Sequence, residues 1–421
     1  MNILIVGGGS REDAIINKLL ENSSINKIFA LPGPGVKKEK VENIEIGVTE
    51  FDKIIEFCNT HKIDFAIVSP DDPLVLGLVD ELDKLNILTF GPNKKAAIIE
   101  GSKSFSKELM KKYNIPTAEY GVFSDSKAAI KYLAQCNFPI VIKADGLALG
   151  KGVVICETRL AAIETVIDFI DNKRFNKSSA KIIIEEFLSG FEVSILAFCD
   201  GKTLKPLVSS MDHKRIYDGD KGLNTGGMGV IAPNPYYTDI VKKYCQENIF
   251  NKTVEAMRKE NRPFKGCLYF GLIINDNKAK VIEYNCRFGD PETQAVLPLL
   301  ESDLLSIMIA CSNGTLDKID VILSNKASCT LVVASGGYPQ SYSKHKKITI
   351  NKLQNSTINY AGVEMVENQL LTNGGRVLSL TSVASNLQTA ISNVYQDVKN
   401  IQFENMYYRH DIGQKALINQ K

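Results

Sequence analysis

The sequence predicts a multidomain protein that combines α/β and α+β parts. Its 421 residues are enough for about three domains of ordinary size. Hydrophobic residues make up 44% and charged residues 23% of the chain, as in a globular protein and unlike a disordered or fibrous one. Near the N-terminus, short apolar runs alternate with longer segments of helical period. This alternation indicates a parallel sheet with helices on its faces.

The first part, residues 1–101, is expected to be the parallel α/β domain. Helices are expected to begin near Arg11, Phe51 and Leu74, and Gly91-Pro92 then interrupts the chain. The apolar runs predict strands. The expected strands are Ile3–Val6, Ile28–Leu31, Phe65–Val68 and Ile87–Phe90.

The middle part is expected to cover residues 102–326, with a small α+β insertion at about residues 119–190. Helices and strands alternate in the insertion over about 70 residues. A long loop, Ser209–Pro235, is expected between the later strands, and loops of that length are often functional. The expected helices are Ser102–Tyr113, Lys127–Gln135 and Leu160–Asp171. The expected strands are Ile140–Lys143, Val153–Cys156, Ile182–Phe187, Val193–Phe198, Cys267–Ile274 and Ala279–Tyr284.

The last part, residues 327–421, is expected to form a small C-terminal α+β domain. Its predicted elements are the strands Cys329–Ala334 and Arg376–Thr381 and the helix Leu387–Val398.

Charge and cysteine content exclude several classes of protein. With 50 basic and 48 acidic residues, the chain lacks the basic excess of a nucleic-acid or membrane-surface binder. The nine cysteines are an odd number without C-x-x-C spacing, which favours reduced thiols. No secretory signal and no apolar run of about 20 residues is apparent. We therefore expect a cytoplasmic protein whose partners are small molecules.

A glycine-rich turn, Gly7-Gly8-Gly9, joins the first predicted strand to the first helix. Backbone N–H groups and the helix dipole can bind a phosphate at such a turn. Glu12 stands at the third glycine position of the dinucleotide fingerprint, and no ribose-binding acid follows Leu31. The turn therefore favours some anion contact over bound NAD, and a tight turn without a ligand is the alternative.

A second glycine-rich segment, Lys143–Gly152, lies between two predicted strands. Gly152 stands where a Walker A motif requires Ser or Thr, so a P-loop is disfavoured. Glycines combined with lysines still suit a hairpin flap that closes over a polyphosphate, and an ordinary flexible hairpin is the alternative.

Two predicted strands carry acidic residues. Glu185 and Glu186 are adjacent, so at most one of them can point into a given cleft. Glu283 and Asn285 are two residues apart and share a face, which presents two oxygen ligands of the kind that Mg²⁺ or Mn²⁺ accepts beside nucleotide phosphates. Arg287 follows with donors for a carboxylate or phosphate. A structural ion-pair cluster is the alternative.

The long loop carries the charged run Asp212–Arg215 and the glycine-rich run Asn224–Gly229. This combination suits a loop that encloses a substrate, and a solvated surface loop is the alternative.

Together the motifs resemble the glycinamide ribonucleotide synthetases of the ATP-grasp superfamily, and the resemblance covers the whole chain. The resemblance implies an ATP-grasp fold in which residues 119–190 form a lid. The matching motifs are Gly91-Pro92, Glu100–Lys103, Ile115–Ala118, Ile142–Ala148, Asp212–Arg215, Asn224–Gly229, Asn285–Thr293, Gly336–Pro339 and Thr372–Val377.

The resemblance implies a ligase of the second step of de novo purine synthesis. Such an enzyme joins glycine to 5-phosphoribosylamine through a glycyl phosphate, with ATP converted to ADP and phosphate. This chemistry requires positioning and charge neutralisation more than a protein nucleophile. The implied cofactors are ATP and Mg²⁺ or Mn²⁺. The implied enzyme is a monomer, with a weak homodimer as the alternative, and it binds no nucleic acid or membrane.

The resemblance also implies a role for each matching residue. The implied ATP-binding residues are Lys103, Lys143, Gly146, Gly150, Lys151, Gly152, Glu185, Glu186, Phe187, Leu188 and Glu192. The implied metal ligands are Glu283 and Asn285. The implied catalytic residues are Asp212, Lys214, Arg287 and Asp290. The implied substrate-binding residues are Gly7, Gly8, Gly9, Asp71, Gly289, Pro291, Glu292 and Arg376.

Two positions depart from the family pattern. The usual Gly-Arg-Glu-His reads Ser10-Arg11-Glu12-Asp13, and the usual Pro-Glu reads Pro70-Asp71. Ser10 and Asp13 have the spacing of a capping box at the start of the first helix. We therefore predict that Asp13 caps this helix and does not contact the substrate.

Two other functions would account for part of this pattern. Another ATP-grasp purine enzyme would share the flap and the strand that carries Glu283 and Asn285, here called the metal strand. The motifs Asp212–Arg215, Asn224–Gly229 and Arg287–Thr293 nevertheless favour the synthetase. A non-catalytic nucleotide sensor would not need both metal ligands and both phosphate-binding lysines, and the chain has all four.

Overall fold

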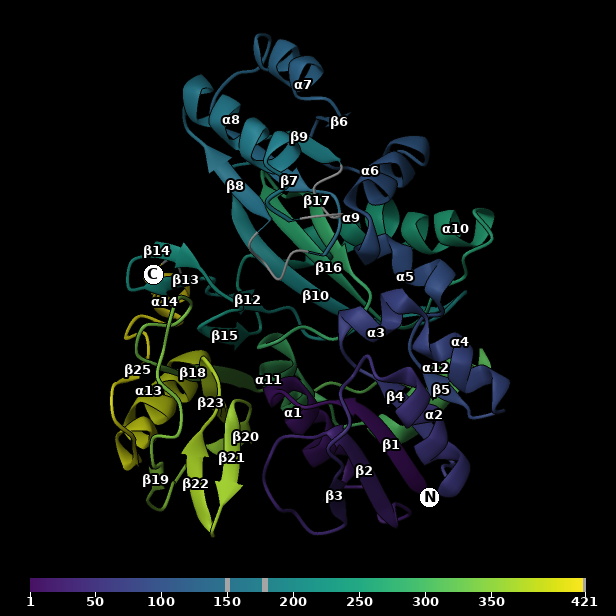
Figure 1. Cartoon of the computed structure of the whole chain (residues 1–421), viewed down its shortest axis with the longest axis vertical. Coiled ribbons are helices and arrows are strands. Elements are labelled where there is room, and N and C mark those ends of the chain that lie inside the picture. The colour runs from purple at the N-terminus through teal and green to yellow at the C-terminus, as the bar shows by residue number, and fades with distance from the viewer. Residues whose placement is uncertain (148–151, 176–180, 419–421) are drawn as a thin grey trace.

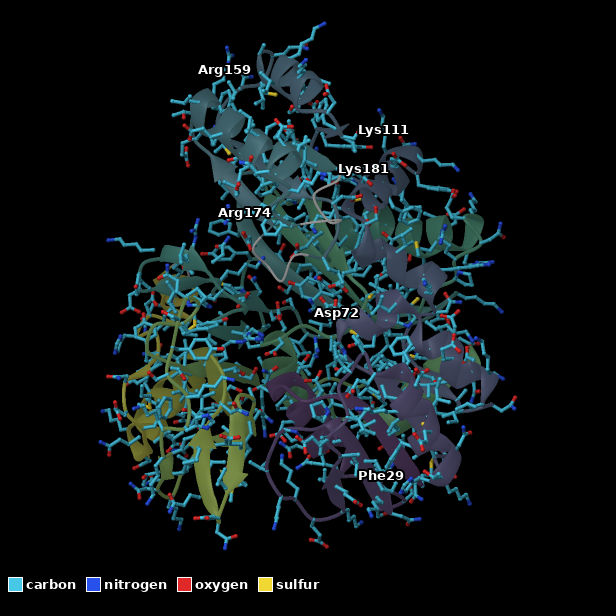
Figure 2. All side chains as sticks on the ribbon, in the orientation of Figure 1. Phe29, Asp72, Lys111, Arg159, Arg174 and Lys181 are labelled. Atoms are coloured by element: carbon cyan, nitrogen blue, oxygen red, sulfur yellow. The ribbon has the colours of Figure 1, made fainter. Side chains whose placement is uncertain are left out.

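The computed structural model describes residues 1–147, 152–175 and 181–418. The N-terminal and C-terminal parts lie side by side at one end of the molecule, and the insertion lies at the other end (Figure 1). In Figure 2 the labels Phe29 and Arg159 mark these two ends.

The N-terminal part is a parallel sheet in the order β3–β2–β1–β4–β5, flanked by helices. Leu4 and Val6 pack into one hydrophobic core and Ile3 and Ile5 into another, so both faces of the first strand are buried. The strands are β1 (Asn2–Gly7), β2 (Lys27–Pro32), β3 (Val41–Asn43), β4 (Phe65–Val68) and β5 (Thr89–Phe90). The helices are α1 (Ser10–Leu19), α2 (Phe51–Thr60), α3 (Asp71–Leu76) and α4 (Leu78–Lys84).

The predicted α/β alternation is confirmed, with two differences. The third predicted helix begins at Asp71, and Gly77, with φ of 103°, divides it into α3 and α4. Strand β3 was not predicted, because Val41–Asn43 is too short and polar to form an apolar run.

The insertion has its own antiparallel sheet, in the order β6–β9–β7–β8, and its own hydrophobic core. Ala129, Leu133 and Ala162 bring the helices onto the buried residues of the sheet. The elements are β6 (Tyr120–Phe123), α7 (Ser126–Leu133), β7 (Ile140–Ala144), β8 (Val153–Cys156), α8 (Arg159–Val166), the π-helix η1 (Ile167–Asp171) and β9 (Ile182–Glu186).

The central part is built on the antiparallel sheet β11–β10–β16–β17. In β17, Glu283 pairs with Gly271 whereas Val281 pairs with Leu272, so Ile282 forms a bulge. The strands are β10 (Phe191–Asp200), β11 (Leu204–Pro206), β16 (Lys265–Asn275) and β17 (Lys278–Asn285). The helices are α5 (Lys94–Gly101), α6 (Lys103–Lys112), α9 (Asp239–Cys245), η3 (Gln246–Phe250), α10 (Asn251–Lys259), α11 (Glu292–Val296), η4 (Leu297–Leu299), α12 (Leu304–Asn313) and η5 (Leu316–Lys318).

The prediction of one long loop at Ser209–Pro235 is wrong. This segment contains β12 (Met211–Asp212), β13 (Arg215–Tyr217), β14 (Lys221–Asn224) and β15 (Gly229–Ala232). Strands β12 and β15 extend the C-terminal sheet, because β15 pairs with β18. These strands have no long apolar alternation of their own, and β15 finds its partner about a hundred residues later in the chain.

The C-terminal part contains a sheet in the order β12–β15–β18–β23–β20, packed against the helix α13. Helix α1 of the N-terminal part packs against β20 and α11, which joins the two ends of the chain. The strands are β18 (Ala327–Ser335), β19 (Thr349–Ile350), β20 (Thr357–Tyr360), β21 (Val363–Val366), β22 (Gln369–Thr372), β23 (Arg376–Ala384), β24 (Ile401–Gln402) and β25 (Met406–Tyr407). The helices are α13 (Leu387–Asp397), η6 (Val398–Asn400) and α14 (Gln414–Ile418).

The cysteines are free thiols, and all except Cys136 are buried. Over the described ranges, no helix has both the length and the apolar character needed to cross a bilayer.

Candidate active site

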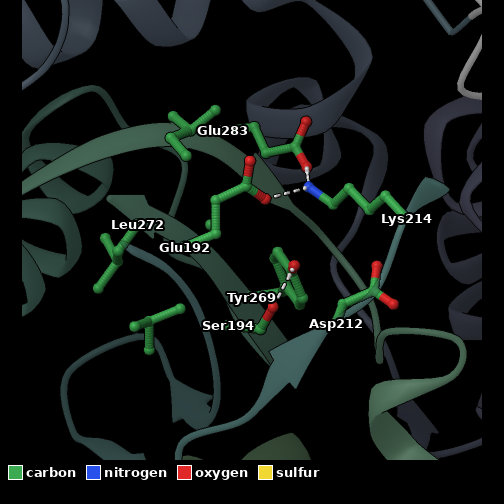
Figure 3. Close-up of a pocket in the computed structure, with 10 residues that line it drawn as sticks. Glu192, Ser194, Asp212, Lys214, Tyr269, Leu272 and Glu283 are labelled. Carbon is green, nitrogen blue, oxygen red and sulfur yellow. Dashed lines mark hydrogen bonds and ion pairs between the residues drawn. The ribbon is translucent and has the colours of Figure 1, made fainter. Parts of the chain in front are cut away.

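A pocket lies where strands β10, β16 and β17 meet the segment around Asp212 and Lys214 (Figure 3). Alternate residues of β10, Glu192 and Ser194, point into it because successive strand residues face opposite sides. The lining residues are Glu192, Val193, Ser194, Asp212, Lys214, Tyr269, Gly271, Leu272, Ile282 and Glu283.

Lys214 links the two sides of the pocket. Its Nζ lies 3.1 Å from Glu192 Oε2 and 3.9 Å from Glu283 Oε1. The Glu192 carboxylate raises the pKa of Lys214 well above its ordinary value. Burial alone would raise the pKa of Glu283, but the positive charges of Lys214, Lys143 and Lys103 outweigh burial and lower it. The Lys214 ammonium and the Glu283 carboxylate are therefore charged at neutral pH.

The floor of the pocket is acidic and hydrogen-bonded. Ser194 Oγ lies 2.8 Å from Tyr269 Oη, and both hydroxyls donate to Glu292 Oε1, at 3.2 and 3.1 Å. Asp212 Oδ1 is buried, and no donor in the described part of the chain reaches it. Burial and the nearby Glu292 charge raise the pKa of Asp212 well above its ordinary value. An unpaired buried carboxylate oxygen is costly, so this corner suits a ligand that brings hydrogen-bond donors or positive charge.

Buried lysines converge on Glu185 beside the pocket. Lys143 Nζ lies 3.1 Å and Lys107 Nζ 3.0 Å from Glu185 Oε2, and Lys143 also donates to the Ile282 carbonyl oxygen at 3.2 Å. Burial lowers the pKa of Lys107 to about 8 although the Glu185 charge opposes this. Lys103 Nζ donates to the Gly146 carbonyl oxygen at 3.0 Å. The lysines thus form a positively charged patch between the insertion and the central sheet.

Sequence reasoning missed Lys107. The spacing could have indicated Lys107 as a site residue, because Lys103 and Lys107 are four residues apart on α6 and so share one face of that helix.

Glu185 and Glu186 point in opposite directions, as the alternation predicted. Glu185 is buried, with 4% exposure, whereas Glu186 pairs with Lys280 at 2.7 Å outside the lysine cluster. Phe187 is exposed and Leu188 half-buried, immediately after β9. Gly150 and Lys151 lie outside the described residues, and Gly152 accepts a backbone hydrogen bond from Ala144 at 2.8 Å.

Glu283 and Asn285 lie on one face of β17, while Tyr284 between them packs into the core. The described residues contain no group of three or more His, Cys, Asp or Glu side chains arranged as a metal site. Two oxygen ligands nevertheless fit a cation that completes its shell with phosphate oxygens and water, as Mg²⁺ does in nucleotide sites.

Arg287 forms an ion pair with Glu100, a residue that the sequence did not identify as part of the site. Arg287 Nη2 lies 3.1 Å from Glu100 Oε1, and the Cys286 N–H donates to Glu100 Oε2 at 2.7 Å. Burial alone would lower the pKa of Arg287, but the charges of Glu100 and Asp71 raise it. Arg287 Nη2 also donates to Asn285 Oδ1 at 3.4 Å, which ties the guanidinium to the metal strand.

Asp290 and Arg376 form an ion pair where the C-terminal sheet meets the central part. Arg376 Nη2 lies 2.8 Å from Asp290 Oδ2, and Nη1 donates to the Asp290 and Gly226 carbonyl oxygens at 2.9 and 2.6 Å. A Cβ added at Gly9 would lie 3.5 Å from Asp290 Oδ2, so the first glycine turn reaches this pair. Gly9 and Arg376, predicted to bind substrate, thus lie together with Asp290, predicted to be catalytic, although they come from three parts of the chain.

Gly7, Gly8 and Gly289, which were predicted to bind substrate, and Gly227 are closely packed against their neighbours. A Cβ at Gly289 would lie 2.3 Å from Glu292 Oε2, and one at Gly227 would lie 2.4 Å from Pro291 Cδ. A Cβ at Gly8 would meet the Gly33 carbonyl oxygen at 2.5 Å, and Gly7 has a φ of 131°. These close contacts explain why glycine occupies the positions.

The prediction that Asp13 caps the first helix is wrong. The cap is Gly9, whose N–H donates to Glu12 Oε2 at 2.6 Å. Asp13 is fully buried, with Oδ1 2.5 Å from Lys38 Nζ and Oδ2 accepting from the Tyr360 N–H at 3.0 Å. The helix starts at Ser10, so Glu12 and not Asp13 occupies the capping-box position.

The fold and the site define a nucleotide-dependent ligase of the ATP-grasp class, with lysines of α6 and of the α+β insertion lying near Glu283 of the central sheet. Three family models match the chain: Phosphoribosylglycinamide synthetase, N domain, at residues 1–100; its ATP-grasp (A) domain at residues 101–293; and its C domain at residues 328–415. The chain belongs to the phosphoribosylglycinamide synthetase family.

Individual relatives agree with this assignment. The chain is 44% identical to the phosphoribosylamine–glycine ligase of Fusobacterium nucleatum, over 98% of both chains, and 45% identical to that of Clostridium acetobutylicum, over 98% and 99%. The solved structure of phosphoribosylamine–glycine ligase from Thermotoga maritima matches with a TM-score of 0.88 at 31% identity, covering 98% of this chain and 100% of that one. A Campylobacter jejuni biotin carboxylase complex shares the fold, with a TM-score of 0.73 at 14% identity over 96% and 92% of the chains. The predicted ATP-grasp fold is confirmed.

Proposed function

We propose that this chain joins glycine to 5-phosphoribosylamine, giving glycinamide ribonucleotide, ADP and phosphate. The observation that carries this proposal is the pocket at Asp212 and Lys214, which places an acidic floor directly beside the metal strand and the lysine cluster. A small zwitterion such as glycine fits an acidic floor with cations at its rim. The relatives are phosphoribosylamine–glycine ligases by name, which supports the same reaction.

ATP is expected to bind between the insertion and the central sheet. Lys103 and Lys143 would contact its phosphates, and Phe187 and Leu188 would line the base pocket at the end of β9. Glu283 and Asn285 would hold Mg²⁺ or Mn²⁺, which supplies charge neutralisation for the transferring phosphoryl group. The buried lysines add to that neutralisation within the chain itself.

Glycine is expected to place its ammonium group at Asp212 and Glu292. Its carboxylate would then face Lys214 and Arg287, which counter the negative charge that opposes approach to the γ-phosphate. A carboxylate oxygen attacks the γ-phosphorus, and ADP leaves with the electrons of the broken bond. The product is glycyl phosphate, an acyl phosphate that is a much better electrophile than the carboxylate.

The second substrate is expected at the junction of Gly9, Asp290 and Arg376. From there the ribosylamine nitrogen attacks the carbonyl carbon of glycyl phosphate, phosphate leaves, and the nitrogen loses a proton. We also propose that the enzyme is a cytoplasmic monomer, with a weak homodimer as the alternative.

One experiment separates this function from its rivals. The enzyme is incubated with ATP and Mg²⁺, and ADP release is measured with glycine alone, with 5-phosphoribosylamine alone and with both. Sustained release only with both substrates is expected. In parallel incubations, ADP release that requires bicarbonate or formate in place of glycine would identify another purine ligase, and ATP binding without any release would identify a nucleotide sensor.

A further inference from the structure

The C-terminal segment, residues 407–415, makes hydrogen bonds and ion pairs with the β13–β14 hairpin, which begins directly after Lys214. In Figure 1 the β13–β14 hairpin lies next to the C-terminal end of the chain, while β12 and β15 lead toward the middle of the molecule. Arg409 is fully buried although it carries a charge, and it makes a bidentate contact with the Asp411 carboxylate at 2.8 and 2.7 Å. Its Nη1 donates to Asp220 Oδ1 at 2.9 Å.

Both chain neighbours of Lys214 are bonded to this segment. Arg409 Nη1 donates to the Arg215 carbonyl oxygen at 3.0 Å. On the other side, the Gly413 N–H donates to His213 Nε2 at 3.1 Å. Lys214 itself is left to reach Glu192 and Glu283 in the pocket.

His213 has only one tautomer compatible with these contacts. A backbone N–H donates to Nε2, so Nε2 must be an unprotonated acceptor and the proton must be on Nδ1. Nδ1 then donates to the Gly229 carbonyl oxygen, 3.1 Å away. The neutral ring therefore connects the C-terminal segment to β15 directly beside Asp212.

Further contacts bind the tip of the hairpin to the same segment. The Gly219 N–H donates to Asp411 Oδ2 at 2.8 Å, and Tyr407 Oη donates to the Ile216 carbonyl oxygen at 2.8 Å. A surface turn would not need a buried arginine with two acidic partners, because a charge taken out of water is costly unless it is fully paired. The free-energy cost of burying the Arg409 charge is understandable if the hairpin must be held in one position.

We propose that Arg409 and His213 are positioning residues of the ligase reaction, which fix Asp212 and Lys214 against the pocket from the C-terminal end of the chain. Neither residue touches the substrates. They act through the backbone on either side of Lys214, and a shift of about 1 Å at such a position is enough to impair catalysis strongly. The inference rests on the proposed function, since it concerns the same glycine pocket.

The test compares Arg409→Lys with Asp397→Asn. Lysine keeps the charge but cannot contact Asp411, Asp220 and the Arg215 carbonyl oxygen together. Asp397 is a matched control, because it is buried in the same C-terminal part and accepts from Gln354 and Asn355 N–H groups far from the hairpin. Both variants are assayed well below their melting temperatures, with equal amounts of folded protein confirmed by circular dichroism.

For Arg409→Lys we expect kcat to fall at least tenfold and the KM for glycine to rise at least fivefold, while the KM for ATP stays within twofold. Asp397→Asn is expected to lower the melting temperature and to leave all three constants within twofold. Folded Arg409→Lys with unchanged kcat and glycine KM would overturn the proposal, because the segment would then serve stability alone.

His213 gives an independent answer if Arg409→Lys does not fold. Glutamine retains one donor and one acceptor at this position, whereas leucine retains neither, so His213→Gln is expected to keep most of the activity that His213→Leu loses. Equal, near-normal activity of both variants would contradict the proposal. If the wild-type chain releases ADP with an acceptor other than glycine, the proposed function fails, and the same variants are compared on that reaction.

Discussion

At the scale of single residues, Asp212 is notable because one of its carboxylate oxygens has no hydrogen-bond donor among the described residues. Its Oδ1 is buried without a donor in the described structure, and Glu292 repels its charge. Such a residue weakens the free protein and becomes favourable only when a cation or a strong donor arrives. The ammonium group of glycine, which we propose to bind at Asp212, would supply both a positive charge and hydrogen-bond donors.

The variant Asp212→Asn tests this reading. It removes a repelled buried charge, so the free energy of unfolding is expected to stay the same or to rise by up to about 1 kcal/mol. The KM for glycine is expected to rise at least tenfold, because a neutral amide attracts an ammonium group less strongly. Steady-state kinetics and urea denaturation measure the two effects, and a lower stability with an unchanged glycine KM would refute the assignment.

The metal strand gives a second residue-scale prediction. Glu283→Gln is expected to lower kcat by two orders of magnitude or more, because metal stabilisation of the phosphoryl charge contributes several kcal/mol. Glu255→Gln is the control, since Glu255 pairs with Lys259 on helix α10 and does not line the pocket. Activity is measured over a Mg²⁺ titration. Near-normal turnover of folded Glu283→Gln at limiting Mg²⁺ would exclude it as a ligand.

The placement of side chains on strands was largely predictable from the sequence. The period of two along a strand separates Glu185 from Glu186 and puts Glu283 beside Asn285, and this needs no knowledge of distant residues. Glu100 was not predictable as the partner of Arg287 in the same way. It acts from a helix nearly two hundred positions earlier, and only the fold brings the two together.

At the scale of elements, the hairpin region was the largest error. Its strands are short and their register depends on partners in the C-terminal sheet, so local apolar periodicity carries no signal for them. Strands β1, β2 and β4 of the N-terminal part were predictable because each contains a continuous buried apolar run. In the insertion, β7 and β9 were predictable for the same reason, whereas β6, which is half-buried along its length, was not predicted.

The hairpin also gives a pH prediction through His213. Burial and the Arg409 charge lower the pKa of His213 from 6.5 to about 4. The unfolded chain therefore binds this proton at a higher pH than the folded chain. The stabilising effect is complete above about pH 6.5 and is lost as the pH falls toward 4.

Between about pH 7 and pH 4.5, this one group is expected to reduce the free energy of unfolding by about 2.5 kcal/mol. Other carboxylates titrate in the same range, so the comparison is with His213→Gln, which cannot take up the proton. Urea denaturation at both pH values is expected to show the larger loss in the wild-type chain. Identical losses in the two proteins would mean that His213 is not buried and neutral.

At the scale of the whole molecule, the two ends of the chain are joined at Asp13. Lys38 comes from the N-terminal part and Tyr360 from β20, 347 residues after Asp13. Ser10 Oγ adds a hydrogen bond to the Asn359 carbonyl oxygen at 3.2 Å. A local motif could not reveal this junction, because the spacing of Ser10 and Asp13 fits a capping box equally well.

Two magnitudes distinguish a junction from a cap. Loss of a helix cap costs about 1 kcal/mol, whereas removal of one partner of a buried ion pair costs about 3 to 5 kcal/mol. Asp13→Ala is therefore expected to reduce the free energy of unfolding by about 3 kcal/mol, and Lys38→Met by a similar amount because it leaves the Asp13 carboxylate buried and unpaired. The double variant is expected to lose at least about 1 kcal/mol less than the sum of the single losses, as partners in direct contact do. Additive losses of about 1 kcal/mol each would restore the capping interpretation.

The KM for 5-phosphoribosylamine is expected to stay within a few-fold in Asp13→Ala, because the Asp13 side chain is fully buried against Lys38 and Tyr360 and none of it is exposed to a ligand.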